Sequence, residues 1–132
     1  MVGNEVQRGV TVDGVSFAPE LESVRSARRL VRDVVSEAGG NADSAEVLTA
    51  ELATNAVMHA NSPFRLKWQR LPSAIRVEIE NDEPQMIARL VEATDSGGRG
   101  LRIVDQLADA WGVETRPESK IVWFELATTN GA

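Results

Sequence analysis

The chain of 132 residues carries 14 basic and 20 acidic side chains, and its formal net charge of −6 argues against non-specific nucleic-acid binding, which draws on lysine and arginine. It contains no cysteine, so disulfides, zinc–thiolate sites and thiol nucleophiles are excluded and a reducing compartment fits. No segment reaches the roughly 18 apolar residues of a membrane span, and MVGNEVQRGV lacks a signal-peptide core, so we expect a cytoplasmic protein without membrane contact.

The length is close to the commonest size of a single domain and allows one sizeable hydrophobic core. We predict a disordered N-terminus over residues 1–9, one folded domain over residues 10–127 and a tail over residues 128–132. No internal repeat or low-complexity segment divides the folded part.

The first predicted elements are a short strand or hairpin in VTVDGVSF (10–17) and a helix that begins near Pro19. Gly39-Gly40 is a good stop for that helix. Its apolar stripe follows the helical period at Val24, Ala27, Val31, Val34 and Ala38. Four arginines flank the stripe: Arg25, Arg28, Arg29 and Arg32. They are either a solvated face or a docking surface for an acidic partner.

A second helix, capped by Asn41 or Asp43 and running to about Asn61, contains the stretch ELATNAVMHA. Glu51, Asn55 and His59 recur every four residues there, so they share one helix face. The carboxylate can orient or deprotonate an attacking hydroxyl, and the amide oxygen can ligate Mg²⁺ together with phosphate oxygens. The alternative is a solvated acid and a capping amide; for the histidine we expect a structural role.

The remaining elements are a hairpin, a third helix and two strands. FRLKWQR (64–70) and AIRVEIE (74–80) alternate apolar and polar residues and predict two antiparallel strands. SGGRGLRIV is a glycine-rich turn feeding a helix over 99–110, with Leu101, Val104 and Leu107 inward. Strands follow over 111–116 and 120–127. The order β-α-α-β-β-α-β-β predicts an α+β two-layer sandwich with a mixed, mostly antiparallel sheet and helices on one face.

Two of these motifs carry a family resemblance. ELATNAVMHA resembles the N-box of the GHKL (Bergerat-fold) ATPases, and SGGRGLRIVDQLADAWGV resembles their second glycine box with its helix and strand. The order and spacing are similar to the small branch of anti-sigma factor serine/threonine kinases like RsbW and SpoIIAB, with related actinobacterial ATP-binding regulators. The resemblance covers roughly residues 15–127 and implies a histidine kinase/Hsp90-like ATPase domain.

Carried over residue by residue, the resemblance implies a site for ATP and Mg²⁺. Glu51 matches the general base that activates a partner's hydroxyl, and Asn55 matches the Mg²⁺ ligand. The turn that wraps the phosphates is matched by Gly98, Arg99, Gly100 and Leu101. The implied partners are a sigma factor, an anti-anti-sigma (STAS-type) protein or both, and a homodimer is among the expected assemblies.

The sequence departs from the family pattern where the adenine base should be recognised. The family places an aspartate there, in a D-x-G-x-G turn, but this chain has no glycine between Asn81 and Ser96. Strand alternation ending at Ile79 predicts Asn81 at the matching inward position, with Asp82 out of phase unless a bulge moves it inward. A neutral acceptor instead of a carboxylate costs on the order of 1–2 kcal/mol of affinity.

Two functions therefore remain open from sequence. The first is an ATP-dependent protein serine/threonine kinase that acts as an anti-sigma factor. The second is a degenerate GHKL binding module, with weak or no ATP binding, that sequesters a protein partner. The segment PQMIARLVEATDS (84–96) is expected to form a short amphipathic helix that covers the pocket, binds a partner or covers the sheet edge.

Overall fold

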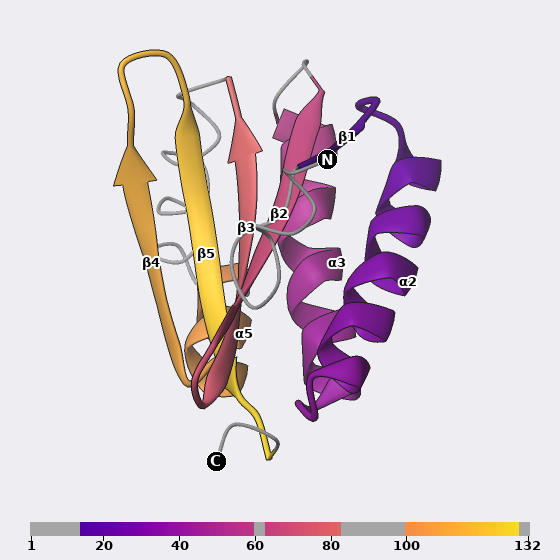
Figure 1. Cartoon of the computed structure of the whole chain (residues 1–132). Coiled ribbons are helices and arrows are strands. Elements are labelled where there is room, and N and C mark those ends of the chain that lie inside the picture. The colour runs from indigo at the N-terminus through magenta and orange to yellow at the C-terminus, as the bar shows by residue number, and fades with distance from the viewer. Residues whose placement is uncertain (1–13, 60–62, 83–99, 130–132) are drawn as a thin grey trace, which may run out of the picture.

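The computed structural model describes residues 14–59, 63–82 and 100–129 (Figure 1). Its helices and strands follow the predicted order. They are β1 (Val15–Phe17), α2 (Leu21–Glu37), α3 (Ala42–His59), β2 (Phe64–Leu71), β3 (Ala74–Asn81), α5 (Gly100–Leu107), β4 (Ala110–Thr115) and β5 (Lys120–Ala127). Among the described helices, none has the length and apolar character needed to cross a membrane.

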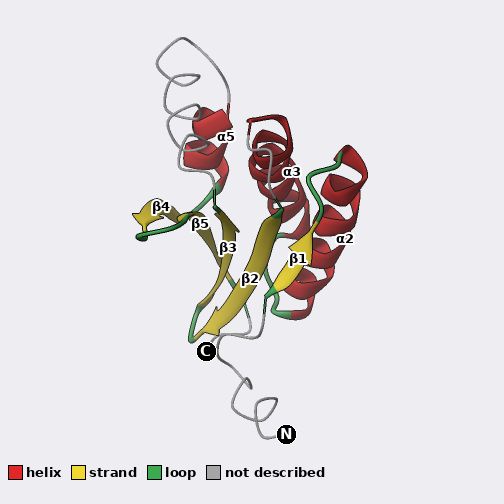
Figure 2. Ribbon diagram, turned by 90° about the horizontal axis from the view of Figure 1, so that it is seen from above, coloured by secondary structure: helices red, strands yellow, loops and turns green. Residues whose placement is uncertain are grey.

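The five strands form one sheet in the order β1-β2-β3-β5-β4. Each of the four described pairings is antiparallel, whereas we expected a mixed sheet. The three helices lie on one face of this sheet (Figure 2). The predicted α+β two-layer sandwich is therefore confirmed.

Local signals explain where the first two helices begin and end. The α2 stripe buries Val24, Ala27, Val31 and Val35, and Val34, which we had predicted in this stripe, is only partly buried. Val35 lies four residues after Val31 and so stands on the same helix face, whereas Val34 lies three residues after Val31 and is turned toward the edge of that face. Gly39 ends the helix region at φ 85°, a conformation that glycine adopts without strain. Asn41 caps α3, since its Oδ1 accepts a hydrogen bond from the Ser44 N–H at 3.0 Å.

The hydrophobic core lies between α2, α3 and the inner face of the sheet. Its largest fully buried side chains include Phe64, Leu66 and Phe124 from the strands and Leu48 and Leu52 from α3. The strand residues come from alternate positions, because successive side chains point to opposite faces of a sheet.

The third helix contributes less to this core than we predicted. Val104 is fully buried, but Leu107 is 36% exposed. The core therefore holds α5 mainly through one apolar side chain among those described.

The outer face of the sheet carries a buried carboxylate, Glu80, which is only 7% exposed. It accepts hydrogen bonds from the Ser119 hydroxyl at 2.7 Å and from Arg65 at 3.1 Å, and the Lys67 ammonium lies 3.3 Å away. Burial alone would raise the pKa of Glu80, but the two hydrogen bonds and the lysine charge outweigh it and lower this pKa from 4.5 to about 2.

This carboxylate makes the stability of the fold sensitive to acid. Because the pKa of Glu80 is lower in the folded protein, its contribution is complete above about pH 4.5 and is lost as the pH falls toward 2. The free energy of unfolding of the wild type falls between pH 7 and pH 3, and we expect this fall to be about 2 kcal/mol smaller in Glu80→Gln. Urea denaturation at both pH values measures this.

The control for this experiment is Glu118→Gln, at an exposed glutamate in the turn between β4 and β5. It should leave the pH dependence as it is in the wild type. A Glu80→Gln protein that loses as much stability as the wild type between the two pH values would contradict the argument.

Candidate nucleotide-binding site

The candidate site begins on α3, where Glu51 and Asn55 are half-buried and lie one turn apart. The Asn55 side-chain amide donates from Nδ2 to the backbone carbonyl of Glu51 at 2.8 Å. A carbonyl can only accept, so this bond fixes which way round the amide lies. The Oδ1 atom is thereby left as the acceptor that the amide can offer to a ligand.

This arrangement fits a magnesium-bound phosphate. Mg²⁺ prefers oxygen ligands and is usually held by few protein oxygens together with substrate phosphates and water. The Asn55 Oδ1 is an oxygen of this kind, and the helix itself holds the amide in place. Glu51, one turn earlier, supplies a carboxylate that can accept a proton.

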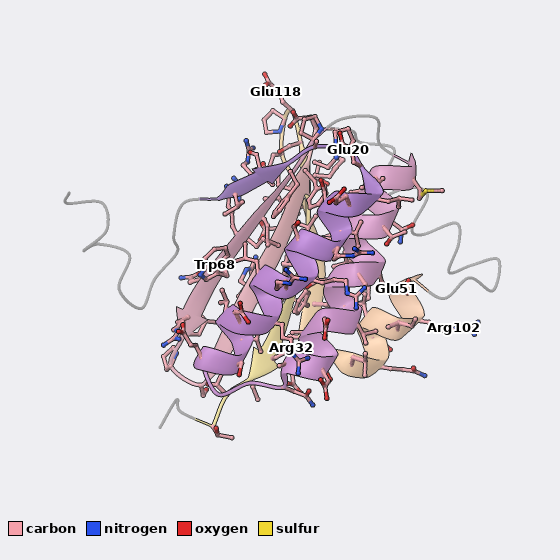
Figure 3. All side chains as sticks on the ribbon, turned by 90° about the vertical axis from the view of Figure 1, so that its right-hand side faces the viewer. Glu20, Arg32, Glu51, Trp68, Arg102 and Glu118 are labelled. Carbon is pink, nitrogen blue, oxygen red and sulfur yellow. The ribbon has the colours of Figure 1, made fainter. Side chains whose placement is uncertain are left out.

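Glu51 also borders a shallow surface depression of about 240 Å³, which it shares with Arg28, Glu46, Val47 and Ala50. The depression lies over α2 and α3. Figure 3 shows Glu51 on α3 and Arg102 on the neighbouring α5, both in the right-hand half of the view. Glu51 is half-buried and borders the depression, so it is reachable from the surface of the helix layer.

Asn81 lies at the end of β3 on the inner face of the sheet and is 1% exposed. It pairs with Phe64 of β2 and with Lys120 of β5, and its Nδ2 donates to the Pro63 carbonyl at 3.3 Å. Both pairings run residue for residue through Asn81, so no bulge turns Asp82 inward. Asp82 is exposed, as the alternation predicted.

Asp82 borders a different depression, of about 270 Å³, with Arg65 and Glu80 among its other lining residues. Asn81 and Asp82, the two candidates for the adenine partner, thus point to opposite faces of the sheet. Asn81 lies on the sheet face that α3 covers, and we retain it as the predicted partner of the base.

The helix that follows the glycine-rich turn, α5, begins at Gly100 and packs beside α3 on the same face of the sheet (Figure 2). This is the juxtaposition that the two sequence boxes imply. Gly98, Arg99, the side chain of Leu101 and the predicted helix over 84–96 lie outside the described residues. Their assigned roles stay predictions.

The arginines of α2 are partly paired with acids of α3. Arg28 lies 3.3 Å from Glu46, and Arg32 lies 2.8 Å from both Asp43 and Glu46. A shallow depression of about 250 Å³ is lined by Glu46 and the four arginines Arg25, Arg28, Arg29 and Arg32. It adjoins the depression at Glu51, because Arg28 and Glu46 line both. Sequence reasoning had found the arginines but not this continuity.

The fold is an α/β sandwich consistent with ATPases of the GHKL type. The model of the histidine kinase-like ATPase domain matches residues 17–126, from the end of β1 almost to the end of β5. The chain therefore belongs to the histidine kinase-like ATPase domain family. Among curated proteins, none matches the chain.

Family membership implies ATP binding, with Mg²⁺ commonly involved, and supports an ATP-binding regulatory function. The match is to the domain family as a whole and does not select a branch within it. The anti-sigma branch, the phosphoryl transfer and the partner are taken up as proposals.

Proposed function

We propose that the chain is an ATP-dependent serine/threonine protein kinase that acts as an anti-sigma factor on an anti-anti-sigma partner. The observation that supports this most directly is the fixed orientation of the Asn55 amide one turn from the Glu51 carboxylate. An oriented oxygen ligand beside a reachable proton acceptor is what phosphoryl transfer requires of a protein, since its catalysis is mostly positioning and charge stabilisation.

The residues would divide the reaction as follows. Asn55 Oδ1 would hold Mg²⁺, which supplies charge neutralisation to the ATP phosphates when bound. Glu51 would orient a serine or threonine hydroxyl of the partner and accept its proton. As the hydroxyl oxygen bonds to the γ-phosphorus, the bond from that phosphorus to the β–γ bridging oxygen breaks and ADP leaves.

The arginine-lined depression on α2 and α3 supports a protein as the phosphoryl acceptor. Within the described residues, no ion pair involves Arg25 or Arg29, so both guanidinium groups are available to acidic side chains. The depression is continuous with the one at Glu51. An acidic segment of a sigma factor or of a STAS-type protein would complement this charge, and charge complementarity favours fast and specific association.

A second function, a binding module with weak or no ATP affinity, is favoured by one observation. Asn81 is buried where the family pattern has an aspartate, and no bulge brings Asp82 in its place. Such a module would use the arginine-lined surface to sequester its partner without phosphorylating it.

Calorimetry with Mg-ATP on the wild type and on Asn81→Asp tests the nucleotide site. We expect the variant to bind about tenfold more tightly, because a carboxylate accepts the adenine amino hydrogen more strongly than an amide does. Lys120, directly opposite in the register, is a neighbouring cation for the new charge. The substitution also removes the 3.3 Å donor to the Pro63 carbonyl and places a buried carboxylate beside that oxygen, so the thermal stability of the free protein should fall.

The matched control is Asp82→Asn, which changes the neighbouring exposed acid and should leave the affinity unchanged. If Asp82→Asn weakens binding while Asn81→Asp does nothing, the adenine assignment is wrong. If neither the wild type nor Asn81→Asp binds Mg-ATP at millimolar concentration, the binding module is the better description.

A further inference from the structure

The helix α5 is short, with eight residues, a length at which an isolated helix is unstable in water. Among its described side chains, Val104 is fully buried, Ile103 is half-buried and Leu107 is 36% exposed. Contacts with the rest of the fold therefore determine its orientation, and polar contacts to the sheet are among them.

One such contact joins α5 to β4. The Trp111 indole donates from Nε1 to the Asp105 carboxylate at 3.0 Å. Trp111 pairs with Phe124 in the sheet register, and its ring packs against the hydrophobic core. The packing of the Trp111 ring against the core thus fixes the position of the indole N–H. Asp105 is the α5 residue that accepts its hydrogen bond. A hydrogen bond to a charged acceptor is stronger than one between neutral groups.

A second contact fixes the C-terminal end of the helix. Asp109 follows α5, and its backbone N–H donates to the Glu125 carbonyl at 2.9 Å. Its carboxylate accepts the Ala127 N–H at 2.7 Å. The chain just after α5 is therefore tied to β5 by two hydrogen bonds.

Trp111 lies on β4, which is the edge strand of the described sheet and pairs there with β5. The Trp123 ring covers the neighbouring Gly112, since a Cβ atom placed on that glycine would meet the ring at 2.7 Å. The Trp111 donor is therefore held by the pairing of β4 with β5 and by the packing of its own ring against the core.

These contacts hold the C-terminal end of α5 against the sheet. From Leu107 to Gly100 the helix axis spans about 10 Å, at about 1.5 Å per residue. If the Asp105–Trp111 bond is lost, the helix can rotate about its C-terminal end. A rotation of about 10° would then move Gly100 by about 2 Å, enough to break hydrogen bonds to a phosphate.

We infer that Asp105 and Trp111 are positioning residues that fix the N-terminal end of α5 beside Glu51 and Asn55, and so determine affinity for the phosphate groups of the nucleotide. The inference rests on the proposed nucleotide site. It adds two residues that do not contact the nucleotide but affect how tightly the nucleotide binds. Sequence reasoning assigned no role to either residue.

The test is calorimetry on Asp105→Ala with two ligands, Mg-ADP and adenosine. We expect the affinity for Mg-ADP to fall about five- to tenfold and the affinity for adenosine to remain unchanged, because adenosine has no phosphate for α5 to meet. Asp105→Asn keeps an oxygen that can accept the indole N–H, and it should restore most of the Mg-ADP affinity.

Two further variants separate positioning from a general structural role. Trp111→Phe keeps an aromatic ring in the core but removes the donor, and it should reproduce the selective loss. The double variant should lose no more than either single variant, because both remove the same bond. Gln106→Ala, at the exposed position next along α5, serves as the control and should bind both ligands as the wild type does.

The outcomes distinguish this inference from the proposed function. An Asp105→Ala protein that binds Mg-ADP as the wild type does, or that loses Mg-ADP and adenosine affinity equally, overturns the positioning role alone. A wild type that binds no Mg-ADP overturns the nucleotide site and the positioning role together.

Discussion

Replacing Glu51 by glutamine is expected to reduce phosphoryl transfer to the partner by between about 10² and 10⁴, the usual range for the loss of a general base. Binding of Mg-ATP should change by less than about twofold. The Asn55 amide is held by the backbone carbonyl of residue 51 and not by its side chain, so the substitution leaves the Mg²⁺ ligand in place. Glutamine keeps the size of the side chain but cannot accept the hydroxyl proton.

Two measurements on the same protein check this expectation. Calorimetry gives the Mg-ATP affinity, and transfer of labelled phosphate from ATP to an anti-anti-sigma protein gives the rate. Glu118→Gln, at an exposed glutamate in the turn between β4 and β5, is the control and should preserve both quantities. If Glu51→Gln transfers phosphate as fast as the wild type, Glu51 is not the general base. If Mg-ATP affinity and the transfer rate fall together, Glu51 has a structural role instead.

The largest effect on stability is expected at Phe124. This side chain is fully buried on β5, and in the register it lies between Val77 of β3 and Trp111 of β4. Phe124→Ala should lower the free energy of unfolding by about 3–5 kcal/mol, because the lost burial is followed by a cavity that a rigid sheet fills only partly. For a domain whose total stability is about 5–15 kcal/mol, this approaches unfolding.

Urea denaturation of Phe124→Ala and of Val113→Ala measures the difference that burial makes. Val113 lies on the neighbouring β4 and is 38% exposed, so its truncation should cost less than about 1 kcal/mol. If Phe124→Ala lowers the free energy of unfolding no more than Val113→Ala does, Phe124 is not a main contributor to the stability of the core.

The Asn81 assignment illustrates how far strand alternation carries. Parity along β3 placed Ile75, Val77, Ile79 and Asn81 on one face from sequence alone, and each of them is buried in the structure. The same parity placed Glu80 on the outer face, where a glutamate would ordinarily be solvated. Its burial under Ser119, Arg65 and Lys67 depends on two other segments, β2 and the turn before β5, meeting there, and nothing local to β3 predicts that.

The helices show the same division between local and non-local information. Caps and period located α2 and α3 within about two residues, and Asn41 proved to be the cap of α3. Sequence reasoning left open whether the α2 arginines form a solvated face or a docking surface for an acidic partner. Two of them pair with acids of α3, because the two helices pack side by side and bring Glu46 within reach.

By itself the sequence determined the order and type of the described elements, the inward face of β2 and β3, and the two boxes that resemble those of a nucleotide-binding sandwich. These features depend on periodicity, capping and turn residues, which act over a few neighbouring positions. Only the tertiary structure decided that β5 inserts between β3 and β4, that Trp111 reaches Asp105, and that α5 lies beside the Glu51 face of α3. Those arrangements join residues distant in the chain, and their energies come from packing and hydrogen bonds that no local pattern encodes.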